Sequence, residues 1–82
     1  MKNQIKLPIN GLWILDNENV RVKSNKTGIT KWLTPEEVTV YDYINGSYTL
    51  SIPNETNFYK CIDWFRKNNL DAYEKVIKEF VA

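Results

Sequence analysis

Hydrophobic and polar residues alternate in the N-terminal part of the chain, as they do in β-strands. The segments "LWIL" and "VRVK" flank the turn-forming residues "DNEN", which predicts a β-hairpin over residues 12–23. The turn sequence "SNKTG" and then "ITKWL" predict a third short strand at residues 29–33. The valines of "VRVK" alternate with Arg21 and Lys23, as expected for a sheet with one face in water. We therefore expect an antiparallel hairpin or a three-stranded sheet here.

The segment "LTPEEV" begins a predicted helix. Thr34 is a suitable cap, Pro35 suits the first helical position, and Glu37 completes a T-x-x-E capping box. We expect this helix to run over residues 35–45 and to stop near Gly46, with "SYTLSIP" extended after it. Its middle, "VTVYDYI", is rich in β-branched and aromatic residues, which leaves a strand as the alternative there.

The last third of the chain has the apolar spacing of two α-helices. In the first, over residues 57–68, apolar side chains recur at i, i+3, i+4 and i+7: Phe58, Cys61, Ile62 and Phe65. Asn54 or Thr56 can cap its start, and "NN" ends it. The second has a D-x-x-E start at Asp71 and the same spacing: Tyr73, Val76, Ile77 and Phe80. Two short helices with a tight connection form a helical hairpin.

Together these elements predict an α+β fold, with an N-terminal hairpin or three-stranded sheet packed on about three short helices. Eighty-two residues give one small domain, 1–82, with a single core. A hydrophobic fraction of 43% and an aromatic fraction of 13% argue against disorder. The residues expected in the core are Trp13, Leu15, Val22, Val38, Tyr41, Ile44, Phe58, Ile62, Phe65, Val76, Ile77 and Phe80.

The composition excludes several kinds of catalytic and metal site. The chain has no histidine and one cysteine, so a single copy cannot form a Cys–His pair, an imidazole catalyst, or a zinc site based on histidine or several thiolates. Neither a P-loop nor a dinucleotide fingerprint occurs. Cys61 lies within an apolar stripe, so we interpret it as a core residue and not as a nucleophile. We expect no cofactor and no metal.

Carboxylate pairs are the remaining candidates for catalysis. The two candidate pairs are Glu36 with Glu37 and Glu55 with Asp63. Negative charge at the start of a helix is the better explanation for the first pair. We therefore rank an enzyme subunit third, behind protein binding and nucleic-acid binding, because it requires a pocket of clustered carboxylates that the sequence does not indicate.

Binding is the class of function that the sequence favours, and the leading hypothesis is a small accessory protein that binds another protein or a second copy of itself. Tyr59 and Trp64 lie on the flanks of the helix at residues 57–68, outside its apolar stripe. An exposed Trp or Tyr is a frequent anchor of protein interfaces. The alternative for both side chains is packing in the core.

The basic segment at residues 21–31 is a second candidate surface, for nucleic acid. Basic side chains neutralise phosphates, and an exposed Trp can stack on a base. The formal net charge is only +1, but the chain through Thr34 holds six basic and two acidic residues, against five and eight in the remainder. The alternative is a solvated hairpin whose lysines protect its edges. The candidate residues are Arg21, Lys23, Lys26, Lys31 and Trp32.

Two segments, "LTPEEVTVYDYI" at 33–44 and "DWFRKNNLDAY" at 63–73, resemble small uncharacterised accessory proteins of marine T4-like phages, especially those that infect cyanobacteria. The resemblance covers about the second half of the chain and leaves out the basic segment. It implies an intracellular phage protein made in a bacterial host, with Trp64 and Phe65 as shared features. It brings no catalytic signature and no functional residue.

The sequence also bears on where the protein acts. The first residues, "MKNQIKLPIN", contain no apolar run long enough for a signal peptide, and no stretch approaches the ~18 apolar residues of a membrane span. One cysteine gives no indication of an oxidising compartment. We therefore expect a cytoplasmic protein (host cytoplasm if phage-encoded) with no membrane partner.

Overall fold

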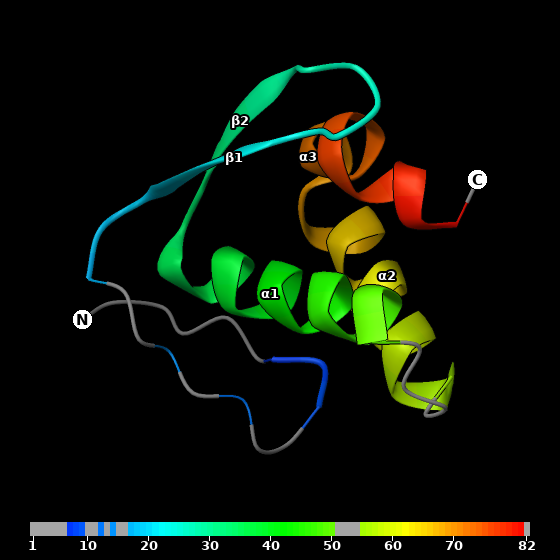
Figure 1. Cartoon of the computed structure of the whole chain (residues 1–82). Coiled ribbons are helices and arrows are strands. Elements are labelled where there is room, and N and C mark those ends of the chain that lie inside the picture. Colours follow the sequence, from blue (N-terminus) through cyan, green and yellow to red (C-terminus); the bar gives the residue numbers. More distant parts are fainter. Residues whose placement is uncertain (1–6, 10–11, 13, 15–16, 51–54, 82) are drawn as a thin grey trace.

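A computed structural model of the chain describes residues 7–9, 12, 14, 17–50 and 55–81 (Figure 1). The α+β fold expected from the sequence is confirmed: a two-stranded antiparallel sheet packs with helices. In chain order the described elements are β1 (Val20–Lys23), β2 (Thr30–Leu33), α1 (Pro35–Leu50), α2 (Glu55–Asn68), α3 (Leu70–Ala72), the π-helical η1 (Tyr73–Ile77) and the 3-10 helical η2 (Lys78–Phe80).

The sheet is a hairpin closed by the turn "SNKTG". The register pairs Val20 with Leu33 at the open end of the hairpin. At the closed end, the Ser24 amide donates to the Ile29 carbonyl at 2.8 Å, and the Gly28 amide donates to the Ser24 carbonyl at 3.0 Å. Gly28 has a φ of 77°, a left-handed conformation that other residues adopt only with strain. The glycine therefore lets the chain reverse at this point.

The hairpin predicted over residues 12–23 is not the one observed. β1 pairs with the predicted third strand, and Leu12 and Ile14 lie in no strand. The other residues of that first predicted strand, Trp13 and Leu15, lie outside the described residues. The turn "SNKTG" supplies a glycine for positive φ, whereas "DNEN" contains none, and this favours the observed pairing.

The predicted capping box begins α1. The Thr34 amide donates to Glu37 Oε1 at 2.9 Å, and the Glu37 amide donates to Thr34 Oγ1 at 3.2 Å. Two of the unpaired amides at the helix start are thereby satisfied reciprocally. Residues 38–44 are helical, so the strand alternative for this segment is excluded.

The end of α1 differs from the prediction. The helix continues through Gly46 to Leu50, so the stop near the glycine and the extended segment after it are wrong for residues 47–50; residues 51–53 lie outside the described residues. Ile44 and Ser47 are both buried, which shows that the packed face of the helix continues past Gly46. The burial of side chains before and after Gly46 offsets the roughly 1 kcal/mol of helix stability that a glycine costs inside a helix.

The connection between α2 and α3 is a single residue. The Asn69 side chain accepts a hydrogen bond from the Ala72 amide at 3.1 Å and so caps α3. The last helix therefore begins at Leu70, one residue before the predicted start at Asp71, with Asn69 as its cap. It then changes to π-helix and to 3-10 helix, and the Lys78 amide donates to the Tyr73 carbonyl across the π-helical turn.

One cluster of buried side chains joins the hairpin to the helices. Among the predicted core residues, Phe58 is half-buried, Trp13 and Leu15 lie outside the described residues, and the others are buried. The prediction omitted Leu33, Val40 and Ala72, which are also buried. Among the helices that the structure describes, none has the length and apolar character needed to span a bilayer.

Candidate binding surfaces

The structure separates the two aromatic residues that were candidates for protein binding. Trp64 is only 8% exposed, and its ring packs edge to face on Phe65 with 5.2 Å between centroids. α2 contacts α1, α3 and η1, and its consecutive residues Trp64 and Phe65 are both buried, so its buried face is wider than a single stripe. Trp64 is therefore a core side chain. Tyr59, in contrast, is 56% exposed.

Tyr59 borders a shallow groove of about 350 Å³, which we call the tyrosine groove. Its lining residues come from α2 and from the C-terminal segment: Tyr59, Ile62, Asp63, Arg66, Tyr73 and Val81. The Tyr59 ring rests edge to face on Phe58, with centroids 5.3 Å apart. Val81 is 38% exposed, whereas Ile62 is buried. The groove thus combines an apolar floor with an exposed aromatic edge.

Charged groups form the rim of the tyrosine groove. Asp63 accepts a hydrogen bond from Arg66, and Lys67 Nζ lies 3.0 Å from its other carboxylate oxygen. Hydrogen bonds from Arg66 and then Lys67 hold the pKa of Asp63 below its ordinary value. The rim therefore carries the carboxylate of Asp63 and the guanidinium of Arg66, with Lys67 beside them.

The exposed side of the hairpin, the outer hairpin face, holds some of the residues proposed for nucleic acid. The register places Arg21 opposite Trp32 and Lys23 opposite Thr30, and all four side chains are exposed. Trp32 is 61% exposed, the highest value among the large hydrophobic residues that the structure describes. The Arg21 guanidinium carbon lies 6.0 Å from the centre of its ring, within reach of a cation–π interaction.

The five residues proposed for nucleic acid do not share one face. Lys31 is paired with Val22 in the register, so it lies on the inner side of the hairpin, where it forms an ion pair with Asp71. Strand alternation requires this, because Lys31 and Trp32 are neighbours in sequence and must point to opposite faces. Lys26 lies in the turn. Arg21, Lys23 and Trp32 remain together.

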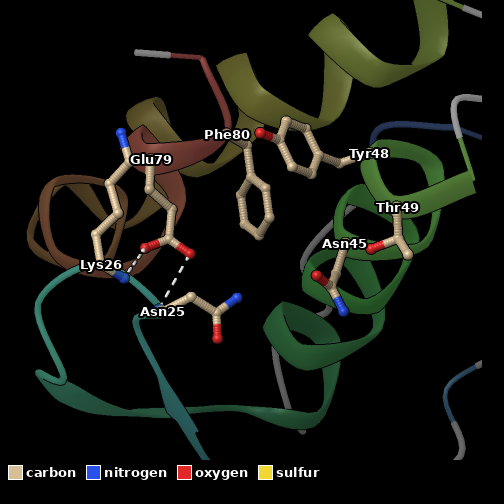
Figure 2. Close-up of a pocket in the computed structure, with 7 residues that line it drawn as sticks. All are labelled: Asn25, Lys26, Asn45, Tyr48, Thr49, Glu79 and Phe80. Atoms are coloured by element: carbon tan, nitrogen blue, oxygen red, sulfur yellow. Dashed lines mark hydrogen bonds between the residues drawn. The ribbon is translucent and has the colours of Figure 1, made fainter.

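Glu79 joins the C-terminal segment to the hairpin turn. Its carboxylate accepts a hydrogen bond from the Ser24 hydroxyl, and the backbone amides of Asn25 and Lys26 lie 3.4 Å from its two oxygens (Figure 2). A carboxylate can accept hydrogen bonds from several donors of one turn. No local pattern in the sequence indicates this contact, because Ser24 and Glu79 lie far apart in the chain.

A second hollow, of about 160 Å³, lies between this turn and α1; we call it the turn pocket. Figure 2 shows the side chains of Asn25 and Asn45 on opposite sides of the hollow, with the Phe80 ring projecting between them. The rings of Phe80 and Tyr48 meet edge to face with 5.2 Å between centroids. The lining residues are Asn25, Lys26, Asn45, Tyr48, Thr49, Glu79 and Phe80. Sequence reasoning had nominated only Lys26.

Cys61 and Glu37, two of the side chains considered for catalysis, have structural roles. Burial raises the pKa of the Cys61 thiol to about 11, so it is protonated at neutral pH. Glu37 accepts hydrogen bonds from the Thr34 amide and, at 3.0 Å, from the Asn69 side chain. Among the described residues no group of three or more acidic, cysteine or histidine side chains is placed to hold a metal ion. The side chain of Glu55 lies outside the described residues.

Comparison of the chain with models of protein families, with curated proteins and with solved structures finds no match.

Proposed function

We propose that this chain is a small non-catalytic accessory protein that acts by binding another protein through the tyrosine groove. The observation that supports this most directly is the position of Tyr59, which is largely exposed at the edge of a groove with an apolar floor. Tyr is among the residues most enriched at the energetic centres of protein interfaces.

The surroundings of Tyr59 support the same proposal. Its ring already packs on Phe58, so binding a partner costs little additional side-chain conformational entropy. Ile62 and Val81 offer apolar surface on which a partner's side chain can be buried. The charged rim at Asp63 and Arg66 orients the bound partner, because polar groups around an apolar centre fix the register of a complex.

The test compares two matched variants, Tyr59→Ala and Leu70→Ala. Both remove an exposed large side chain, and Leu70, at the start of α3, is not part of the groove. We expect a partner protein retained by the wild type to bind Leu70→Ala equally well and to lose at least about tenfold in affinity for Tyr59→Ala. Equal retention of the partner by both variants would refute the groove as the binding surface.

A homodimer is one form that this binding can take. Sedimentation equilibrium over a range of protein concentrations measures self-association directly. If the groove holds a second copy, the wild type and Leu70→Ala will associate and Tyr59→Ala will remain monomeric at the same concentration. A wild type that stays monomeric throughout would exclude a second copy as the occupant of the groove.

Nucleic-acid binding is a second candidate, favoured by one observation on the outer hairpin face. Arg21 and Lys23 share that face with the exposed ring of Trp32. Cations that neutralise phosphates beside an aromatic platform are typical of single-strand binding. Among the residues that the structure describes, this face carries two cations and Lys31 lies on the other side, so we expect weak binding that falls with added salt.

Fluorescence titration with mixed-sequence single- and double-stranded DNA and RNA tests this second candidate. Quenching should be saturable at low salt, weaker at moderate salt, and lost in Arg21→Gln with Lys23→Gln, a variant that keeps Trp32 as the reporter. The matched control is Lys60→Gln, which removes an exposed charge from α2 instead. Unchanged fluorescence of the wild type at low salt would exclude the candidate.

The setting we propose for either function is the cytoplasm of a bacterial host. This proposal rests on the resemblance of residues 33–44 and 63–73 to accessory proteins of marine T4-like phages. Expression during infection, followed by fractionation of infected cells, is the experiment that tests it.

A further inference from the structure

We propose that the turn pocket binds one planar six-membered ring that carries hydrogen-bond donors and acceptors, the chemistry of a pyrimidine base. This inference goes beyond the proposed function, since the pocket and the tyrosine groove have no lining residue in common. It rests on the size of the pocket, on its aromatic wall and on two carboxamides that face each other across it.

The volume sets the size of the ligand. The pocket measures about 160 Å³. An engineered protein cavity of roughly 150 Å³ accepts a molecule of benzene. One six-membered ring therefore fills the turn pocket, whereas a purine, with its second fused ring, extends out of it. Tyr48 and Thr49 are exposed, so a sugar attached to the ring can project into solvent.

The aromatic wall suits a flat ligand. Phe80 and Tyr48 meet at an interplanar angle of 67°, so their surfaces form a corner and not a flat platform. Phe80 also meets the ring of Tyr41 edge to face, with 6.1 Å between centroids. A ring placed in this corner packs on the face of one aromatic side chain and against the edge of the other, which are both favourable arrangements.

The carboxamides of Asn25 and Asn45 supply the polar recognition. Within the part of the chain that the structure describes, neither side chain has a hydrogen-bond partner, so both are free for a ligand. Each carboxamide offers two N–H donors and one oxygen acceptor. The edge of uracil or cytosine places donors and acceptors next to one another, and two amides on opposite sides can satisfy that edge.

The charges of the pocket favour a neutral ligand. Glu79 and Lys26 both line it, and they carry opposite charges. The Glu79 carboxylate accepts hydrogen bonds from the Ser24 hydroxyl and the Lys26 amide, which hold it at the wall. Because these opposite charges largely offset each other, the pocket gives neither a phosphate nor a lone cation a net attraction. A pyrimidine ring is uncharged at neutral pH and needs no such attraction.

The ring can come from a free nucleoside or from a base within a single strand. Titration of the ¹⁵N-labelled protein with uridine, cytidine and adenosine, followed by amide chemical shifts, tests the first source. We expect saturable shifts at residues 25–26, 45–49 and 79–80 with the two pyrimidines, and at least about threefold weaker binding of adenosine. A matched titration with an oligo-uridine distinguishes the second source, because only then do the amides of β1 and β2 shift as well.

Two kinds of control separate specific recognition from simple ring burial. Asn45→Ala and Asn25→Ala should each weaken uridine binding about five- to tenfold, as expected for a lost hydrogen bond, while Asn19→Ala, outside the pocket, leaves binding unchanged. Asn45 lies in α1, where alanine favours the helix, so this variant should fold. Equal binding of 1,3-dimethyluracil, which cannot donate, or shifts absent from residues 45–49 at millimolar uridine, would overturn the proposal.

Discussion

At the scale of single residues, burial decides what Cys61 can do. The helical spacing predicted that this thiol lies in the core, and its side chain is fully buried between the packed helices. Burial disfavours the thiolate, which is the reactive form. The same physical effect that makes cysteine a good core residue thus removes it as a nucleophile.

The Cys61 thiol should therefore react slowly with alkylating reagents. Its pKa rises from an ordinary 9.0 to about 11, so at about pH 8 the thiolate population falls roughly a hundredfold. We expect iodoacetamide to modify the native protein at least about a hundredfold more slowly than the urea-unfolded protein, which is the internal control. Equal rates in the two states would show that the thiol is accessible.

Asp71 should make the stability depend on pH in the acid range. Hydrogen bonds from Lys31 and then Lys75 lower its pKa from 3.8 to about 2. Because the folded-state pKa is the lower one, this contribution is complete above about pH 4 and is lost as the pH falls toward 2. Urea unfolding at about pH 6 and about pH 2.5 should show a smaller loss of stability for Asp71→Asn than for the wild type.

The control for this prediction is Glu74→Gln, which removes an exposed carboxylate from the next turn of the same helix. It should keep the acid sensitivity of the wild type. An Asp71→Asn protein that loses as much stability between the two pH values as the wild type would contradict the assignment to Asp71.

Trp64 and Tyr59 show the limit of reasoning from single residues. A helical wheel places both on the flanks of the apolar stripe, and the wheel alone cannot tell which flank is covered. The answer depends on α1, α3 and η1, which all contact α2. Trp64 is enclosed by that packing, whereas Tyr59, earlier in the helix, is left at the surface.

At the scale of elements, Glu37 connects the starts of two helices. One carboxylate oxygen closes the capping box of α1, and the other accepts from the Asn69 side chain, which in turn caps α3. The first half of this arrangement was predictable, because a capping box is local in sequence. The second half was not, because it joins residues 32 positions apart.

A double-mutant cycle measures this connection. Glu37→Ala and Asn69→Ala should each destabilise the protein by about 1–3 kcal/mol, since each removes a cap contact from a partly buried site. The double variant should be more stable than the sum predicts, by about 1 kcal/mol, because the two side chains share one hydrogen bond. Additive effects in urea denaturation would show that the bond between them contributes nothing.

The hairpin and the end of α1 show why element boundaries were harder to predict than element types. "VRVK" and "ITKWL" were both predicted as strands, but only tertiary packing and the turn at Gly28 select their pairing. Gly46 is a common helix terminator when it stands at an exposed end. Here buried side chains on both sides keep it inside the helix.

At the scale of the whole molecule, the two proposed binding sites are formed by segments that meet only after folding. The turn pocket draws its residues from the hairpin turn, α1 and η2, and the tyrosine groove draws them from α2 and the C-terminal segment. Figure 1 shows the closed end of the hairpin beside the C-terminal helical segments. Neither site has a local sequence signature, so periodicity and motif spacing could indicate a core but not these hollows.

Phe65 is the residue on which this assembly should depend most. It is fully buried and has the largest side chain among the fully buried residues that the structure describes. Phe65→Ala removes that side chain and leaves a cavity, which should cost roughly 3–5 kcal/mol, a large part of the ~5–15 kcal/mol typical of a domain. Trp32→Ala is the matched control, because it removes a larger but exposed ring and should cost less than about 1 kcal/mol. Urea melts decide the question: a change below about 1 kcal/mol for Phe65→Ala would mean that the hairpin and the helices are not held by a common core.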